Sequence, residues 1–105
     1  MASVAPQDTA FVHRAALFIS SIELEWAASD PASLVQTNAI WLDQFHTAML
    51  PFTSKHCYQN FIDDSQSDFL QAYYGSNLER LVKVKAAVDP GNIFNYPQSI
   101  PVSLA

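Results

Sequence analysis

Charged side chains are scarce in this sequence, and the scarcity limits how the chain can fold. Asp, Glu, Lys and Arg make up 14% of the 105 residues, whereas 50% are hydrophobic and 12% are aromatic. Soluble domains carry about 25% charged residues. A monomer of this length has too few charges to cover its own surface. We therefore expect part of its apolar surface to pack against another polypeptide.

The rest of the composition excludes several classes of protein. The net charge of −5 and the lack of a basic run argue against a nucleic-acid partner. Gly75 and Gly91 stand alone, so no glycine-rich nucleotide loop is encoded. No apolar run reaches the roughly 18 residues of a spanning helix, and the N-terminus lacks a cationic signal-peptide start. These features predict no membrane association and favour the cytoplasm. The single Cys57 and the separated histidines predict no metal site.

Small and polar residues with a proline predict a flexible leader at residues 1–9, and the chain length predicts one domain, expected over residues 10–105. Side chains alternate between apolar and polar towards the end of residues 16–26, which is typical of a half-buried strand. Residues 55–62 are rich in aromatic and strand-forming residues and predict a second strand. Helical spacing predicts three helices, and their expected ranges are 31–49, with Asp30 as the N-terminal cap, 69–75 and 76–87.

These elements predict an α+β fold, with a small antiparallel sheet portion of about two strands and three helices. A lone pair of strands is marginal in water. We therefore expect an incomplete part of a larger domain.

The sequence is most distinctive towards its C-terminus. The segment YYGSNLERLVKVK at residues 73–85 is followed by DPGNIFNYPQSIP at residues 89–101. In this order the two segments resemble the C-terminal signature of berberine-bridge-enzyme-like FAD-linked oxidases of the vanillyl-alcohol-oxidase type. Upstream, AFVHR at residues 10–14 and YQNF at residues 58–61 resemble preceding segments of the same family. The resemblance covers nearly the whole chain after residue 9.

The resemblance implies a role as well as a fold. The matching segments belong to the last part of the family's substrate domain, which closes over FAD held by a large preceding domain. None of that domain is in this sequence, so we expect the chain alone to bind no FAD and to catalyse nothing. A flavin-binding protein or domain would supply the FAD, and the pocket would accept a small apolar organic substrate. The alternative is a free-standing, non-catalytic module that self-associates and binds a small apolar ligand or stabilises a partner.

Two aromatic residues are the predicted pocket residues. In many relatives the residue that matches Phe61 is a tyrosine whose hydroxyl acts as a general base. Phenylalanine has no ionisable group, so no catalytic residue is predicted in this chain. We expect Phe61 and Tyr58 to line an apolar substrate pocket, and the alternative for Phe61 is a place in the core.

Three amide side chains are the predicted cofactor-binding residues, by the same resemblance. Asn60 would lie near the flavin, and Asn95 and Gln98 would lie close to the junction with the flavin domain. An amide both donates and accepts hydrogen bonds, so each also has a purely structural interpretation. Asn60 would then close a strand end or turn, whereas Asn95 and Gln98 would cap the backbone of an extended tail.

Overall fold

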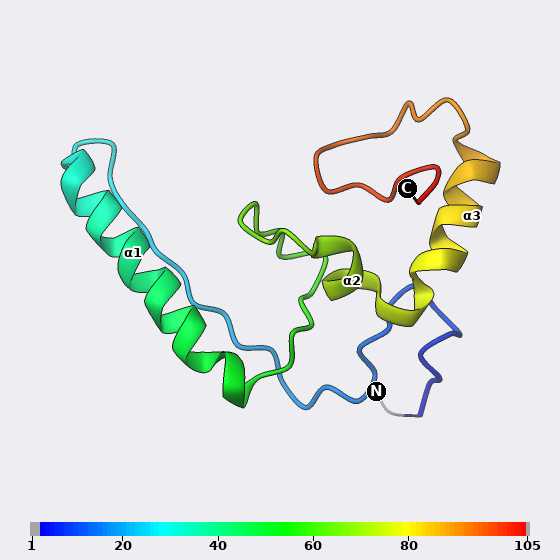
Figure 1. Cartoon of the computed structure of the whole chain (residues 1–105), viewed down its shortest axis with the longest axis horizontal. Coiled ribbons are helices and arrows are strands. Elements are labelled where there is room, and N and C mark those ends of the chain that lie inside the picture. The colour runs from blue at the N-terminus through cyan, green and yellow to red at the C-terminus, as the bar shows by residue number, and fades with distance from the viewer. Residues whose placement is uncertain (1–2, 105) are drawn as a thin grey trace. The chain divides into compact units, whose positions relative to one another are not determined.

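The computed structural model describes residues 3–104, so the first two residues of the leader predicted at 1–9 and the last residue of the domain predicted at 10–105 lie outside that range. The chain divides into two compact units (Figure 1). The first, here called the terminal unit, joins Met1–Leu17 to His56–Ala105, and the second, the central unit, is Phe18–Lys55.

The central unit contains one long helix, α1, at Ala32–Met49, followed by a 3-10 turn at Leu50–Phe52. Pro31 precedes the helix, and its carbonyl accepts the first backbone hydrogen bonds. Asp30 does not cap α1 as predicted, because its carboxylate accepts from the Ala27 N–H instead, at 2.8 Å. No residue of α1 is buried. None of the described helices is long and apolar enough to span a membrane.

The predicted fold class is wrong, because residues 3–104 contain no strand and therefore no antiparallel sheet. Within that range, residues 17–26 make no backbone–backbone hydrogen bond. At residues 55–62 the backbone folds into a turn, with the Phe61 N–H bonded to the Tyr58 carbonyl at 2.9 Å. Alternation of side chains suits a strand, but a strand also needs a neighbour that accepts its hydrogen bonds. The chain supplies no such neighbour among the described residues.

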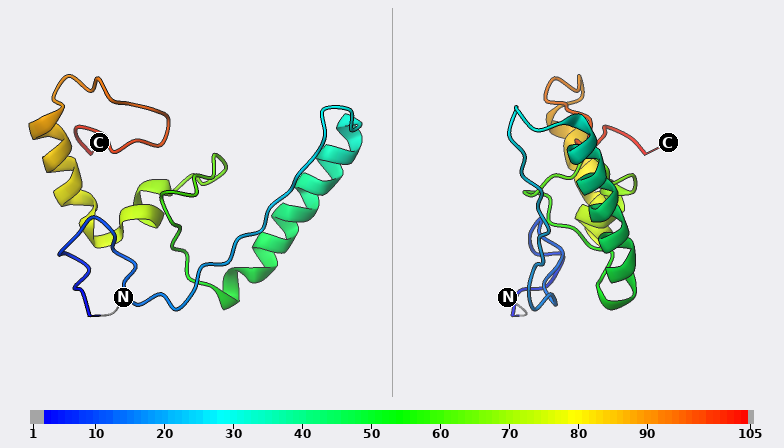
Figure 2. Two further views of the ribbon diagram at one scale, coloured as in Figure 1. Left: turned by 180° about the vertical axis from the view of Figure 1, so that it is seen from behind. Right: turned by 90° about the vertical axis from the view of Figure 1, so that its left-hand side faces the viewer.

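The terminal unit is built around two short helices that follow one another. Helix α2 spans Phe69–Tyr74, a 3-10 turn covers Gly75–Asn77, and helix α3 spans Leu78–Val88. A tail without regular structure leaves the end of α3, as the view from behind in Figure 2 shows. The hydrophobic core is small, and its buried members are Ala72, Tyr73, Tyr74 and Val82.

Gly75 allows the turn between α2 and α3, and it is the basis of a first prediction. Its φ of 46° and ψ of −126° are strained for any residue with a Cβ. A Cβ there would lie 3.6 Å from the Val12 methyl groups, which is ordinary contact, so the strain comes from the backbone. Gly75→Ala is expected to lower the free energy of unfolding by about 1–3 kcal/mol, measured by urea denaturation.

Gly91→Ala is the matched control for this prediction. Gly91 does not have a positive φ, and a Cβ there would lie 3.8 Å from the Ile93 side chain. Its substitution is expected to change stability by less than about 0.5 kcal/mol. Equal unfolding midpoints for the two variants would contradict the role given to Gly75.

Candidate functional site

Two segments far apart in the sequence, residues 10–14 and 56–61, meet in the terminal unit and form a row of aromatic rings. Ring centroids are 5.8 Å apart between Phe61 and Tyr58, and 5.6 Å apart between Tyr58 and Phe11. The row continues from Phe11 to His13 at 5.6 Å and from His13 to His56 at 4.9 Å. These spacings are those of interacting aromatic pairs. We call these five rings the aromatic row.

Arg14 fixes one member of the row. Its guanidinium carbon lies 5.0 Å from the centre of the Phe11 ring, a cation–π arrangement. Arg14 also donates to the Phe11 carbonyl at 3.1 Å and to the Thr9 hydroxyl. Arg14 thus holds the Phe11 ring, and the contact of this ring with Tyr58 joins the AFVHR segment to the YQNF segment.

The structure places three predicted site residues at one end of the aromatic row. Tyr58 is half-buried, and the Asn60 amide donates to its hydroxyl at 3.0 Å. Phe61 is 61% exposed, so it is not a core residue of this chain. At this end of the aromatic row the Phe61 ring is therefore exposed, and the Asn60 amide is hydrogen-bonded to Tyr58.

Gln98, the most buried of the predicted site residues, is fully engaged in a network inside the chain. Its Oε1 accepts from the Tyr73 hydroxyl at 2.9 Å, and its Nε2 donates to the Asp63 carbonyl at 2.7 Å. The Tyr73 hydroxyl in turn accepts from the Asp63 N–H at 3.2 Å. This network joins α2, the turn that begins at Asp63 and the tail after α3.

Asn95 lies apart from the aromatic row, on the exposed tail. Its amide donates to the Asn92 carbonyl at 2.8 Å and so supports the local turn. In this structure the side-chain amides of Asn95 and Gln98 both donate to backbone carbonyls of the chain itself. Cofactor contact by Asn60, Asn95 or Gln98 stays a prediction.

The close approach of the His13 and His56 rings is a feature that sequence reasoning missed, because the two residues are far apart in the chain and share no periodic spacing. His13 Nε2 lies 3.0 Å from the Tyr73 carbonyl, which can only accept, so Nε2 carries a proton. Burial lowers the pKa of His13, and the nearby His56 lowers it further. Hydrogen bonds with the backbone at Tyr73 and Cys57 act in the opposite direction.

The lowered pKa of His13 predicts how stability depends on pH. The fold favours the neutral ring, so the contribution of His13 is complete above its ordinary pKa of 6.5 and is lost as the pH falls through the lowered pKa. We expect the thermal unfolding temperature to fall as the pH is lowered from 6.5, measured by circular dichroism. His13→Gln, which keeps a donor for Tyr73, should flatten this dependence, whereas His46→Gln on α1 should not. An unchanged profile in His13→Gln would contradict the assignment.

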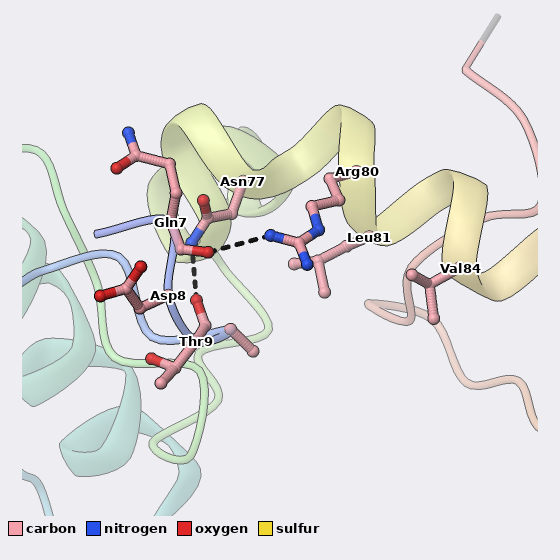
Figure 3. Close-up of a pocket in the computed structure, with 8 residues that line it drawn as sticks. Gln7, Asp8, Thr9, Asn77, Arg80, Leu81 and Val84 are labelled. Carbon is pink, nitrogen blue, oxygen red and sulfur yellow. Dashed lines mark hydrogen bonds between the residues drawn. The ribbon is translucent and has the colours of Figure 1, made fainter. Parts of the chain in front are cut away.

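A small cavity lies elsewhere in the terminal unit, between residues 7–10 and α3 (Figure 3). Asn77 donates to the Pro6 and Thr9 carbonyls at 2.8 and 3.0 Å, and Arg80 donates to the Gln7 carbonyl at 3.0 Å. The cavity volume is about 160 Å³, and none of the predicted site residues lines it. Its lining residues are Gln7, Asp8, Thr9, Ala10, Asn77, Arg80, Leu81 and Val84.

The described residues do not fit FAD by themselves. Pockets for cofactors and drug-sized ligands have volumes of about 300–1,000 Å³, well above that of this cavity. The predicted cofactor amides already have partners within the chain. Within residues 3–104, no three His, Cys, Asp or Glu side chains are grouped so that they could hold a metal ion.

Comparison with known proteins finds relatives among FAD-linked oxidoreductases. The chain is 36% identical over 98 residues to the uncharacterized FAD-linked oxidoreductase YgaK of Bacillus subtilis, covering 93% of this chain and 21% of that protein. It is 30% identical over 122 residues to reticuline oxidase of Papaver somniferum, covering 96% of this chain and 23% of that protein. Berberine bridge enzyme-like 1 of Arabidopsis thaliana is 36% identical over 118 residues, covering 96% of this chain and 21% of that protein.

The chain thus spans about a fifth of the length of these relatives. No solved structure gives a significant match. Residues 57–101 match the family described as "Berberine and berberine like". This range holds the segments after residue 56 that carried the resemblance, which is confirmed. Residues 57–101 thus match the berberine and berberine-like family model, and over nearly its whole length the chain is similar to one segment of proteins named as FAD-linked oxidoreductases.

Proposed function

We propose that the chain is the berberine-like portion of an FAD-dependent oxidoreductase and packs against a flavin-carrying polypeptide. In that assembly the partner holds the FAD, and the chain completes the wall of the flavin and substrate pocket. The family match and the naming of the relatives as FAD-linked oxidoreductases support this proposal. The small cavity and the engaged amides of this chain support placing the FAD on the partner.

The observation that carries the proposal is that many large apolar side chains of this chain are exposed. Trp26 and Phe61 are each 61% exposed, Ile93 is 78% exposed and Phe94 is 79% exposed. Soluble monomers rarely leave so much apolar surface open unless a partner covers it. The unpaired backbone of residues 17–26 offers a second means of attachment, because it can add to the edge of a partner's sheet.

Phe61 and Tyr58 contribute shape and exclusion of water to the proposed pocket. Phe61 has no ionisable group and takes no proton from a substrate. Its exposed ring stacks on Tyr58 at 5.8 Å and presents an apolar face. An apolar organic molecule is the ligand class that such a face accepts.

A chimera tests the proposal. The segment of the Bacillus subtilis relative YgaK that matches this chain is replaced by this chain, and flavin absorbance is measured after purification. We expect the chimera to retain flavin, whereas YgaK without the segment loses it. This chain expressed alone should be colourless.

A soluble chimera without flavin would reject the proposed function. If the isolated chain also forms a stable homo-oligomer, the result would favour the self-associating module.

A further inference from the structure

The loop that follows α3 is held rigidly by one buried carboxylate. Asp89 is 7% exposed and accepts from the Ile93 and Phe94 N–H groups at 2.8 and 3.1 Å. Lys85 donates both to this carboxylate and to the Phe94 carbonyl. The hydrogen bond from Lys85 lowers the pKa of Asp89, and those from Ile93 and Phe94 also favour its charged form. Hydrogen bonds therefore hold both the N–H groups of Ile93 and Phe94 and the carbonyl of Phe94 in place.

This fixed loop carries large apolar side chains that the described residues 3–104 leave mostly uncovered. Ile93 is 78% exposed and Phe94 is 79% exposed, next to Val88 at 77%. Asn92, at a φ of 50°, makes the turn that precedes them. Apolar residues on a mobile loop can fold back onto the protein, but here the hydrogen bonds of Asp89 and Lys85 fix the backbone that carries them. We call Val88, Ile93 and Phe94 the apolar knob.

We propose that the apolar knob is a preorganised docking element that inserts into an apolar recess of the flavin-carrying polypeptide. This inference rests on the proposed function and names the surface through which the chain attaches. A fixed loop loses little conformational entropy on binding, which favours docking. The proposal predicts that Ile93 and Phe94 matter for assembly but not for the stability of the chain alone.

Two observations favour the flavin-carrying polypeptide over a lipid surface or a second copy of the chain as the partner of the apolar knob. The matched relatives extend over nearly four times as much chain again beyond the matched segment, and that additional chain offers a large polypeptide surface for the apolar knob. The net charge of −5 repels both an anionic lipid surface and a second copy of the chain. The flavin-carrying polypeptide is therefore the partner that the apolar knob contacts.

The test uses the YgaK chimera described above with Ile93→Ser and Phe94→Ser combined. We expect flavin to be released at least tenfold faster than from the parent chimera, measured by flavin fluorescence after dilution. In the isolated chain the same double variant should leave the unfolding temperature unchanged. Phe52→Ser is the matched control, because Phe52 is 81% exposed but lies in the central unit, and it should release flavin at the parent rate.

The outcomes separate this inference from the proposed function. A parent chimera without flavin rejects both. A parent chimera that holds flavin, with the same release rate in the double variant or an equal acceleration by Phe52→Ser, rejects the knob and leaves the proposed function standing. An isolated chain that is a dimer and becomes a monomer in the double variant would show that a second copy occupies the knob, and would overturn the inference.

A second variant tests preorganisation. Asp89→Asn removes the charge that holds the loop without changing the apolar knob itself. We expect it to accelerate flavin release from the chimera several-fold while the chimera's far-ultraviolet circular dichroism stays as in the parent. Release at the parent rate would show that docking does not depend on the fixed loop.

Discussion

Replacing Tyr73 by alanine is expected to unfold the terminal unit or bring it close to unfolding. Tyr73 is 1% exposed and is the largest fully buried side chain in the described part of the chain. Removing a buried aromatic ring costs about 3–5 kcal/mol, because the lost contacts leave a cavity. A loss of that size is a large fraction of the stability of a small domain. Urea denaturation followed by circular dichroism measures it.

Two further variants separate the contributions of Tyr73. Tyr73→Phe keeps the ring but leaves Gln98 Oε1 and the Asp63 N–H without their partner, and is expected to cost about 1–3 kcal/mol. Phe94→Ala removes an aromatic ring that is 79% exposed and should cost less than about 0.5 kcal/mol. Similar losses for Tyr73→Ala and Phe94→Ala would contradict the assignment of the core.

Gln98→Leu is the second substitution with a large expected effect, and it distinguishes two roles for this side chain. Leucine can neither accept from the Tyr73 hydroxyl nor donate to the Asp63 carbonyl. A buried polar group without a partner costs about 1–3 kcal/mol. We expect a loss of that order in the isolated chain without any flavin present, measured by urea denaturation. A residue whose role is limited to cofactor contact would show no loss under these conditions.

Asn95→Ala is the control for Gln98. Asn95 is exposed and makes one hydrogen bond, to the Asn92 carbonyl. Its replacement should change stability by less than about 0.5 kcal/mol. Equal losses at the two positions would mean that the network around Gln98 is not formed in solution.

The long helices could be placed from the sequence, whereas the predicted strands could not. The expected helix at 31–49 is observed as Ala32–Met49, because Pro31 fixes its start and apolar residues recur at helical spacing. A helix makes its backbone hydrogen bonds within itself. Residues 16–26 have the alternation of a strand, but alternation does not show whether a neighbouring strand exists. That information lies outside the segment, and the prediction failed there.

The candidate site shows the same limit. Tyr58 and Phe61 stack because a short turn brings close neighbours together, and that proximity follows from the sequence. The contacts of His13 with His56 and of Gln98 with Asp63 join segments far apart in the chain. No periodicity connects such positions, so only the folded structure shows them. The resemblance to a family located the segments but not the hydrogen bonds between them.

The division of the chain also determines when it can fold during synthesis. The terminal unit is made of two stretches separated by the 38 residues of Phe18–Lys55, and its first stretch bonds to Tyr73 and Asn77. A ribosome must therefore synthesise the chain as far as Asn77 before residues 6–13 find these partners. Closing so long a loop carries an entropic cost that grows with the logarithm of its length. Until then the apolar residues of Phe18–Lys55 emerge first, and we expect chaperones to bind the nascent chain there.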